Sequence, residues 1–309
     1  ADFPAMVASG RTLVAHWLEK SGRSSYAYDV RMSRSIDGGA SWSAPVTPHR
    51  DQTESEHGFV SLWPQEGGAV GAVWVDGRRS GPGGGMNLRT ATLSAAGDLG
   101  DEVELDDRIC DCCQTAVALT SDGPIVTYRD RTADEIRDIA VVRLVNGAWT
   151  APAKVADEQW RINACPVNGP AVAAQRRDVA VAWFTAAGGT RRVEVAFSSD
   201  AGANFGGPTV VDDGHPVGRV GVIMLDDGAA LVSWLEDAGA GAEVRVRRVA
   251  PSGERGQAQT VARTAAGRPS GFPRMVRAGE RVVFAWRDPE QAGGARIRTA
   301  VARLARGQR

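Results

Sequence analysis

The chain has 309 residues, of which 43% are hydrophobic, and its formal net charge at pH 7 is -1. This composition excludes extensive disorder. A near-neutral charge offers no basic face for phosphates, so we expect no nucleic-acid partner, and no apolar run reaches the roughly 18 residues that a membrane-spanning helix needs. The chain starts at Ala1 without a methionine, from which we expect that a tag or a secretory signal peptide was removed. We therefore predict a periplasmic or extracellular monomer.

One pattern recurs along the chain and predicts its architecture. A short apolar run ends in an aromatic residue and is followed by polar or charged residues and a polar or Gly-rich loop. The aromatic residues, at spacings of 51 to 57 residues, are Trp17, Trp74, Tyr128, Trp183, Trp234 and Trp286. Four short strands with their turns fill a repeat of this length, as in a propeller blade. Two β-sandwiches in which the spacing arises by chance are the alternative interpretation.

We predict an all-β chain that forms one six-bladed β-propeller domain over residues 1–309. The blades are expected at approximately 1–50, 51–106, 107–159, 160–213, 214–266 and 267–309. Blade six ends after "ARIRTAVARLA", so its outer strand is expected to be missing or to be supplied from upstream of Ala1.

Two stretches fit the pattern S-x-D-x-G-x-x-[W/F], namely "SIDGGASW" and "SSDAGANF". The residues concerned are Ser35, Asp37, Gly39 and Trp42 in the first copy and Asp200, Gly202 and Phe205 in the second. In a tight hairpin the aspartate accepts backbone N–H groups, the glycine takes a positive φ and the ring covers the loop. The pattern closely resembles the Asp-box, or BNR repeat, of sialidase-like propellers. The resemblance implies that these hairpins are structural and lie on the face opposite the active site.

The cysteines are concentrated at the starts of predicted blades. "CDCC" holds Cys110, Cys112 and Cys113, and the remaining cysteine is Cys165. His57 begins the blade before "CDCC". Because innermost strands converge on the propeller axis, we expect these five side chains to gather at one mouth of the central channel.

Thiolate and imidazole ligands favour soft or borderline metals, so we predict a metal site for copper first and zinc second. Its ligands are Cys112, Cys113, Cys165 and His57, with Cys110 as a further ligand or as a disulfide partner. Adjacent residues of a strand point to opposite faces, so Cys112 and Cys113 can share a metal only if this segment is irregular. In an oxidising compartment the alternative is no metal and two disulfides, or one disulfide from "CDCC" to Cys165, and the sequence does not rank the connectivities.

Arginines and acids are dense in the loops expected around the same mouth. The arginines are Arg78, Arg129, Arg131 and Arg137, together with Arg219 and Arg274 at blade starts. Arginine forks suit carboxylates and phosphates, which predicts a site for a small anionic ligand or a glycan. Mutually paired scaffolding is the alternative.

The resemblance to sialidases implies a glycoside hydrolase of exo-sialidase type, but the sequence departs from that pattern. Asp2 stands where the family has the first arginine of its substrate-binding triad. The family nucleophile is a tyrosine late in the chain, whereas the tyrosines here are Tyr26, Tyr28 and Tyr128. Hydrolysis with inversion needs only two carboxylates, for which Glu56 with Asp76 or Glu135 is available.

The sequence therefore predicts an exported metal-binding propeller. The alternative is a sialidase-like glycoside hydrolase or a lectin-like glycan-binding module that uses the arginine-rich and acid-rich face. Whether any reaction is catalysed stays open at this point.

Overall fold

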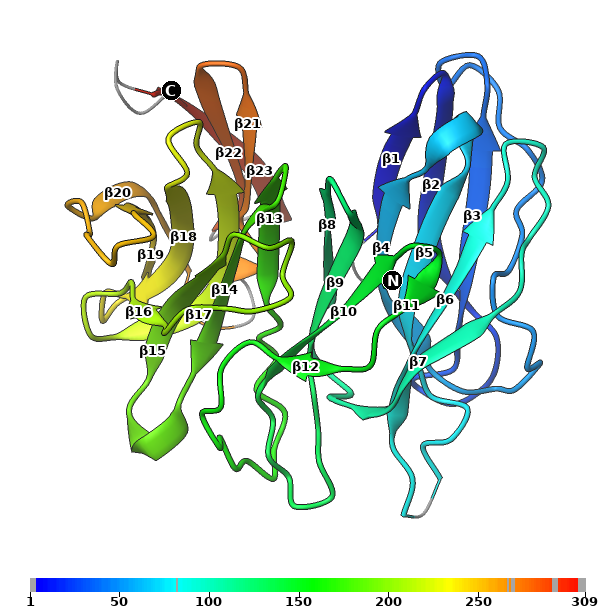
Figure 1. Ribbon diagram of the computed structural model, residues 1–309, viewed down its shortest axis with the longest axis horizontal. Coiled ribbons are helices and arrows are strands. Elements are labelled where there is room, and N and C mark those ends of the chain that lie inside the picture. The colour runs from blue at the N-terminus through cyan, green and yellow to red at the C-terminus, as the bar shows by residue number, and fades with distance from the viewer. Residues whose placement is uncertain (1–3, 82, 266, 268–269, 291–293, 305–309) are drawn as a thin grey trace.

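The computed structural model describes residues 4–81, 83–265, 267, 270–290 and 294–304. Within these ranges the strands form six antiparallel sheets that follow one another in chain order (Figure 1). The predicted all-β, six-bladed propeller is confirmed. Asp2 lies outside the described residues.

The first three blades contain strands β1 to β12. In blades 1 and 2 these are β1 (Ala5–Ser9), β2 (Thr12–Lys20), β3 (Tyr28–Ser35), β4 (His57–Pro64), β5 (Val70–Asp76), β6 (Met86–Leu93) and β7 (Val103–Ile109). In blade 3 they are β8 (Ala116–Thr120), β9 (Gly123–Arg129), β10 (Ile139–Val145), β11 (Ala148–Trp149) and β12 (Ala153–Lys154). Each blade starts with its innermost strand.

The last three blades contain strands β13 to β23. These are β13 (Ala171–Gln175), β14 (Asp178–Thr185), β15 (Arg192–Ser198), β16 (Thr209–Val210), β17 (Pro216–Met224), β18 (Ala230–Asp237), β19 (Ala242–Val249), β20 (Gln259–Thr264), β21 (Arg274–Ala278), β22 (Arg281–Glu290) and β23 (Gly294–Arg303). Two short 3-10 turns, η1 (Glu66–Gly68) and η2 (Ala187–Gly189), connect strands in blade 2 and blade 4.

The core lies between blades and not within them. Trp74 of β5 packs with valines of β2 and β3 in blade 1, and Trp183 of β14 packs with Ile125 and other apolar residues of blade 3. Both indole rings are fully buried. The repeating aromatic is therefore the residue with which one sheet covers the face of the preceding sheet, and this explains its period.

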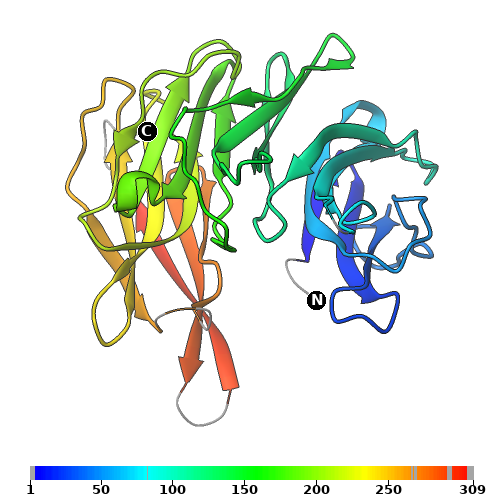
Figure 2. The ribbon, with the colours of Figure 1, turned by 90° about the horizontal axis from the view of Figure 1, so that it is seen from below.

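The two ends of the ring differ from the rest. Innermost strands pack side by side from β1 through β4, β8, β13 and β17 to β21, but no core cluster of the described residues joins blade 6 to blade 1. These two blades stand apart in Figure 2. Trp17 of blade 1, whose equivalents in other blades pack on the preceding blade, is only half-buried. Within the described residues, blade 6 is a three-stranded sheet whose last strand is β23.

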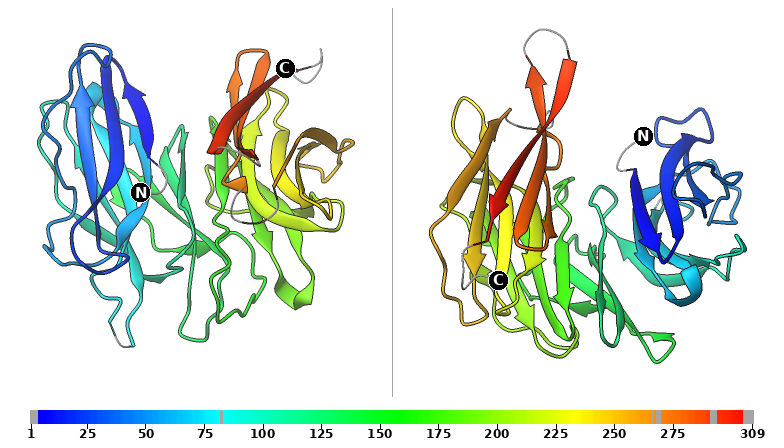
Figure 3. Two further views of the ribbon diagram at one scale, coloured as in Figure 1. Left: turned by 180° about the vertical axis from the view of Figure 1, so that it is seen from behind. Right: turned by 90° about the horizontal axis from the view of Figure 1, so that it is seen from above.

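Antiparallel pairing sorts the loops onto two faces. The segments before each innermost strand and the loops after each second strand lie on one face, which we call the mouth face. The turns that join the first and second strands of each blade, such as the turn between β1 and β2, lie on the opposite face. The hairpins after the third strands lie there too (Figure 3). No helix of the described residues has the length and apolar character that a membrane crossing requires.

The two Asp-box hairpins make matching contacts. In the first, Asp37 Oδ1 accepts a hydrogen bond from Ser41 N at 2.9 Å and Gly39 has φ +93°. In the second, Asp200 Oδ1 accepts from Asn204 N at 2.9 Å and Gly202 has φ +82°. Hydrogen bonds from Ser41 and from Asn204 lower the pKa of Asp37 and of Asp200, respectively, to about 2. Both hairpins lie opposite the mouth face.

Candidate functional site

The "CDCC" segment leaves the outermost strand of blade 2 and leads into blade 3. Cys110 directly follows β7, and its backbone N–H donates to Arg129 O at the end of β9 at 2.9 Å. Asp111 and Cys112 then form a turn, so the chain is not extended here. This turn removes the strand alternation that would send the side chains of Cys112 and Cys113 to opposite faces.

A pair of amide hydrogen bonds joins this segment to blade 4. Gln114 Nε2 donates to Gly169 O at 3.1 Å, and Gly169 N donates to Gln114 Oε1 at 2.9 Å. A Cβ at Gly169 would lie only 2.0 Å from Gln114 O, so only glycine allows this close approach. The lead-in to β13, which carries Cys165, is thereby held beside the "CDCC" turn.

The sulfur atoms of the segment lie close together. Cys110 Sγ is 2.9 Å from Cys113 Sγ and 3.8 Å from Cys112 Sγ. One ligand atom from each of these three residues lies within 4.8 Å of the others, and the same is true of a second group formed by Asp111, Cys112 and Cys165. All four cysteines are free thiols. Sulfurs around one tetrahedral metal, with bonds of about 2.3 Å, lie about 3.8 Å apart. The three thiols therefore need only a small opening to hold one ion.

Two buried arginines flank the thiols. Arg137 Nη1 lies 3.4 Å from Cys110 Sγ and 3.3 Å from Asp111 Oδ1. Hydrogen bonds with the thiols of Cys112 and Cys113 lower the pKa of Cys110, and the positive charge of Arg129 acts in the same direction. Burial raises the pKa of Cys113, and hydrogen bonding with Cys110 raises that of Cys112. These interactions make Cys110 the most acidic of the three thiols.

Arg129 is completely buried but does not face an acid. Its guanidinium donates to the carbonyls of Asn168 at 3.0 Å, Arg137 at 2.6 Å and Phe184 at 2.6 Å. It also lies over the Trp160 ring at 4.8 Å. In the part of the chain that the structure describes, Arg129 has no carboxylate partner. A buried cation without a counter-charge is costly, so an anionic centre nearby would stabilise it.

Most of the other arginines predicted to bind an anion already have partners. Arg131 binds Glu135 through two nitrogens, with a closest distance of 2.7 Å, and Arg137 Nη2 binds the same carboxylate at 2.8 Å. Arg219 donates to Val167 O and lies 4.0 Å over the Phe272 ring. Arg274 begins β21 and is exposed. Apart from Arg274, these residues serve as paired scaffolding of the mouth face.

His57 does not lie with the thiols. No group of ligand side chains in the described chain contains both His57 and a cysteine. Its Nδ1 hydrogen-bonds Tyr28 O at 2.9 Å, and its Nε2 lies 3.2 Å from Asp51 Oδ1 and 3.6 Å from Asp76 Oδ2. Its ring stacks on His49 with centroids 3.6 Å apart. We therefore remove His57 from the predicted metal site, because the bulged start of β4 directs its ring into a separate cluster of acids.

The predicted catalytic carboxylates are held by strong donors. Asp76 is fully buried; it accepts from Arg78 Nε at 2.8 Å, Arg78 Nη2 at 2.8 Å and Trp74 Nε1 at 2.8 Å. Arg78 also binds Glu102 at 2.7 Å. Glu135 is shared by two arginines, as described above. Glu56 lies at the half-buried start of blade 2, and its backbone carbonyl accepts from Gly77 N at 2.7 Å. Asp76 and Glu135 are thus fully engaged with protein groups.

Sequence reasoning missed two pairs of polar side chains, Tyr128 with Asp106 and Glu158 with Glu194. Tyr128 OH donates to Asp106 Oδ2 at 2.6 Å between β9 and β7, where burial raises the pKa of both groups. Burial and the nearby charge of Glu194 raise the pKa of Glu158 to about 7, and Trp183 Nε1 donates to Glu158 at 2.9 Å. The acids of each pair lie far from their partners in sequence, and no motif marks them.

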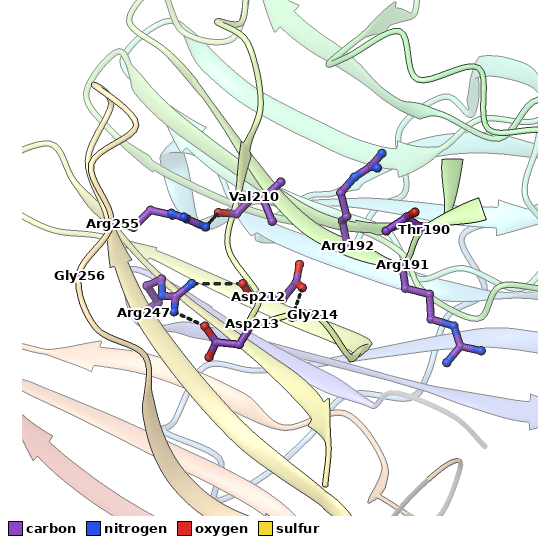
Figure 4. A pocket seen from close by; sticks show the side chains of 10 residues that line it. All are labelled: Thr190, Arg191, Arg192, Val210, Asp212, Asp213, Gly214, Arg247, Arg255 and Gly256. Carbon is purple, nitrogen blue, oxygen red and sulfur yellow. Dashed lines mark hydrogen bonds and ion pairs between the residues drawn. The ribbon is translucent and has the colours of Figure 1, made fainter. Parts of the chain in front are cut away.

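A groove of about 500 Å³ lies between blades 4 and 5 (Figure 4). Four arginines line it: Arg191, Arg192, Arg247 and Arg255. Asp213 is paired with Arg247 at 2.5 Å, whereas Arg191 is exposed and has no partner in the described residues. In Figure 4, Arg191 and Arg255 lie on opposite sides of the aspartates. The groove therefore has an arginine on each side, Arg191 and Arg255, with Asp212 and Asp213 between them.

No protein-family model matches the chain, and no curated protein is similar to it in sequence. Solved structures share its fold. A protein of unknown function from Dyadobacter fermentans is 15% identical, with a TM-score of 0.61, and the match covers 98% of this chain and 94% of that one. The GH93 α-L-arabinofuranosidase of Fusarium graminearum, solved with arabinobiose, is 14% identical with a TM-score of 0.61, covering 97% and 91%. The Hadza microbial sialidase Hz136 is 14% identical with a TM-score of 0.57, covering 97% and 65%. The fold is the six-bladed propeller of sialidase-like and arabinanase-like proteins.

Proposed function

We propose that this propeller binds a soft metal ion, Cu(I) in preference to Zn(II), through Cys110, Cys112 and Cys113. The observation that carries the proposal is the convergence of the three sulfur atoms within 4.8 Å in a turn anchored to blades 3 and 4. Thiolates select Cu(I) and Zn(II) over harder ions, and a site built on rigid elements is preorganised for its ion.

The charges around the site support the same proposal. Three thiolates around one Cu(I) carry two negative charges. The buried guanidinium groups of Arg129, which has no carboxylate partner in the described residues, and of Arg137, which is also bound to Glu135, lie beside them. The metal-bound thiolates would thus supply the counter-charge that Arg129 lacks. In an oxidising compartment, a bound Cu(I) would also protect these sulfurs from disulfide formation.

The test is metal binding by the purified full chain. Cu(I) is presented as its bicinchoninate complex. One Cu(I) per chain should transfer to the reduced protein, and the fall in absorbance of the Cu(I)–bicinchoninate complex measures this transfer. Changing Cys113 to Ser should weaken binding by about 100-fold, because substituting a ligand costs at least as much as the 10-fold to 100-fold typical of groups outside the ligand shell. Ser121→Cys, which adds a thiol on the opposite face, is the matched control and should leave affinity unchanged. No transfer to the reduced chain, or isolation of a chain with two disulfides and no metal, would contradict the proposal.

A glycan-directed function is the second candidate, and the structural comparisons favour it over the metal site. The similar structures with a named activity include sialidases, an arabinanase, an arabinofuranosidase and a polysaccharide lyase. The arginine-lined groove between blades 4 and 5 fits an acidic sugar chain. Fold alone does not define function, and the engaged state of Asp76 and Glu135 makes binding a better proposal than hydrolysis.

This candidate has its own test. Aryl glycosides, sialosides included, would report hydrolysis, and titration with acidic and neutral oligosaccharides would report binding. We expect no turnover and a preference for acidic chains that Arg191→Ala weakens by about threefold to tenfold, as expected for one exposed charge contact. Equal binding of neutral and acidic chains, or none of either, would contradict a role for the groove.

A further inference from the structure

The thiol cluster consists of two overlapping groups of ligands. The inner group is Cys110, Cys112 and Cys113, and the outer group is Asp111, Cys112 and Cys165. Cys112 belongs to both groups. An ion bound in either group therefore already has one ligand of the other.

The two groups differ in access to solvent. Cys165 is exposed, and the side chain of Asp111 is 40% exposed. Cys112 is half-buried, whereas Cys110 and Cys113 are buried. A path from solvent to the inner sulfurs thus passes the outer group first.

The two groups also differ in ligand chemistry. The outer group offers two sulfurs and a carboxylate, and the inner group offers three sulfurs. A carboxylate is a hard ligand and thiolate a soft one, so a soft ion is held more tightly by the inner group. Movement inward is therefore favourable.

Arg137 connects the two groups. Its Nη1 lies 3.3 Å from Asp111 Oδ1 and 3.4 Å from Cys110 Sγ, while its Nη2 is fixed to Glu135 at 2.8 Å. When Asp111 releases an ion, its carboxylate has this guanidinium as a ready partner.

We propose that Asp111, Cys112 and Cys165 form a capture site, from which the ion moves to the inner three-thiol site by exchange of ligands around Cys112. Bonds from the metal to Asp111 and Cys165 break as bonds to Cys110 and Cys113 form. The metal keeps its oxidation state, Cys165 regains a proton from water, and Cys110 and Cys113 release theirs to water. The proposal rests on the proposed function, because it requires the inner site to bind the metal.

The test separates the rate of uptake from the affinity at equilibrium. Cu(I) bicinchoninate is mixed with reduced protein by stopped flow, and the same chelator gives the equilibrium constant. Cys165→Ser should slow uptake by about 10-fold and change affinity by less than about threefold, since it removes an entry ligand but no ligand of the final site. Asp111→Asn should slow uptake by about threefold, and Asp134→Asn, a change of an exposed loop acid on the same face, is the matched control that should not. X-ray absorption should count three sulfur ligands in both wild type and Cys165→Ser.

The outcomes divide cleanly. Equal uptake rates for wild type and Cys165→Ser would overturn the capture site. A loss of affinity in Cys165→Ser as large as that in Cys113→Ser would overturn it too, because it would show a single site that contains both residues. Failure of the wild-type chain to bind Cu(I) at all would instead refute the proposed function. Cys165 is exposed, so its replacement by Ser is not expected to disturb folding, and circular dichroism checks this.

Discussion

The mouth face carries two clusters of side chains that could bind a metal, one around His57 and one around Cys112, and they differ in what neutralises them. Around His57, the acids Asp51 and Asp76 are met by the Arg78 guanidinium at 3.5 and 2.8 Å, so a cation is already part of the protein. Around Cys112, the sulfurs face one another. Arg137 contacts Cys110 Sγ at 3.4 Å but is also bound to Glu135, and the nearby Arg129 has only carbonyl partners. Residue types that look equally suited to a metal therefore differ in how far protein cations already balance their charge.

The largest expected effect on stability comes from disrupting the cluster around His57, in which Arg78 neutralises the acids. Asp76→Ala leaves the guanidinium of Arg78 and the indole N–H of Trp74 without a buried partner, and we expect a loss of about 3–5 kcal/mol in the free energy of unfolding. Asp111→Ala, which removes a 40% exposed acid of the thiol cluster, should cost about 0–1 kcal/mol. Urea denaturation measures both, and equal losses would contradict the distinction between the clusters.

A second prediction uses a histidine that has no partners at all. His16 of β2 is buried, neither ring nitrogen has a hydrogen-bond partner in the described chain, and burial lowers its pKa from 6.5 to about 4. The folded state thus takes up a proton at lower pH than the unfolded state. Above pH 6.5, His16 is neutral in both states and does not lower the free energy of unfolding. As the pH falls from 6.5 to 4, the free energy of unfolding should fall by about 3 kcal/mol.

His16→Leu should remove this part of the pH dependence. The measurement is the free energy of unfolding of both chains at pH 7, 5.5 and 4. If wild type and variant lose the same stability between pH 7 and 4, the buried imidazole is not the cause.

The third prediction asks to which cluster His57 belongs in solution. Free Cu(I) at about 100 times its dissociation constant should stabilise the folded chain by about 2.7 kcal/mol. This increment should persist in His57→Gln, whatever the variant's stability without metal. In Cys113→Ser it should fall to about 0.4 kcal/mol, because 100-fold weaker binding leaves Cu(I) at about the dissociation constant. A thermal or urea titration with and without Cu(I) reports it, and its loss in His57→Gln would return His57 to the metal site.

The smallest effect is expected from the acid pair in blades 3 and 4. Because burial and Glu194 raise the pKa of Glu158 from 4.5 to about 7, the folded chain binds a proton more tightly than the unfolded chain. Stability should therefore fall as the pH rises from about 4.5 through 7, on the order of 2 kcal/mol after allowance for solvent screening of a half-buried group. Arg192 Nε binds Glu194 at 2.9 Å. Because this positive charge partly neutralises Glu194, it limits the loss of stability.

Glu158→Gln should abolish that fall, and its advantage over wild type should be larger at pH 8 than at pH 5. Asp157→Asn changes the neighbouring exposed acid and is the control. Parallel pH curves for wild type and Glu158→Gln would show that the raised pKa of Glu158 is not the cause of the fall in stability.

The fold could be read from local pattern because each blade repeats one apolar run. The aromatic at its end, as in Trp74 and Trp183, has to cover the preceding sheet, and this requirement leaves a period in the sequence. The site was readable only in part. The order of first strands placed Cys165 beside the "CDCC" segment, where Asp111, Cys112 and Cys165 now lie together. The side-chain directions of His57 and Asp111 were not readable, because the first depends on a bulged strand start and the second on a turn.

The sequence by itself therefore determined the number of blades, the two Asp-box hairpins and the face on which the thiols lie, because these follow from spacing along the chain. Only the tertiary structure decided which acids are already paired with arginines. It alone also showed that Cys112 can belong both to a buried group of possible ligands and to an exposed one. The physical reason is that charge balance and metal geometry depend on distances of a few ångströms between side chains of different blades. Strand order places such residues near one another, but turns and bulges set the distances.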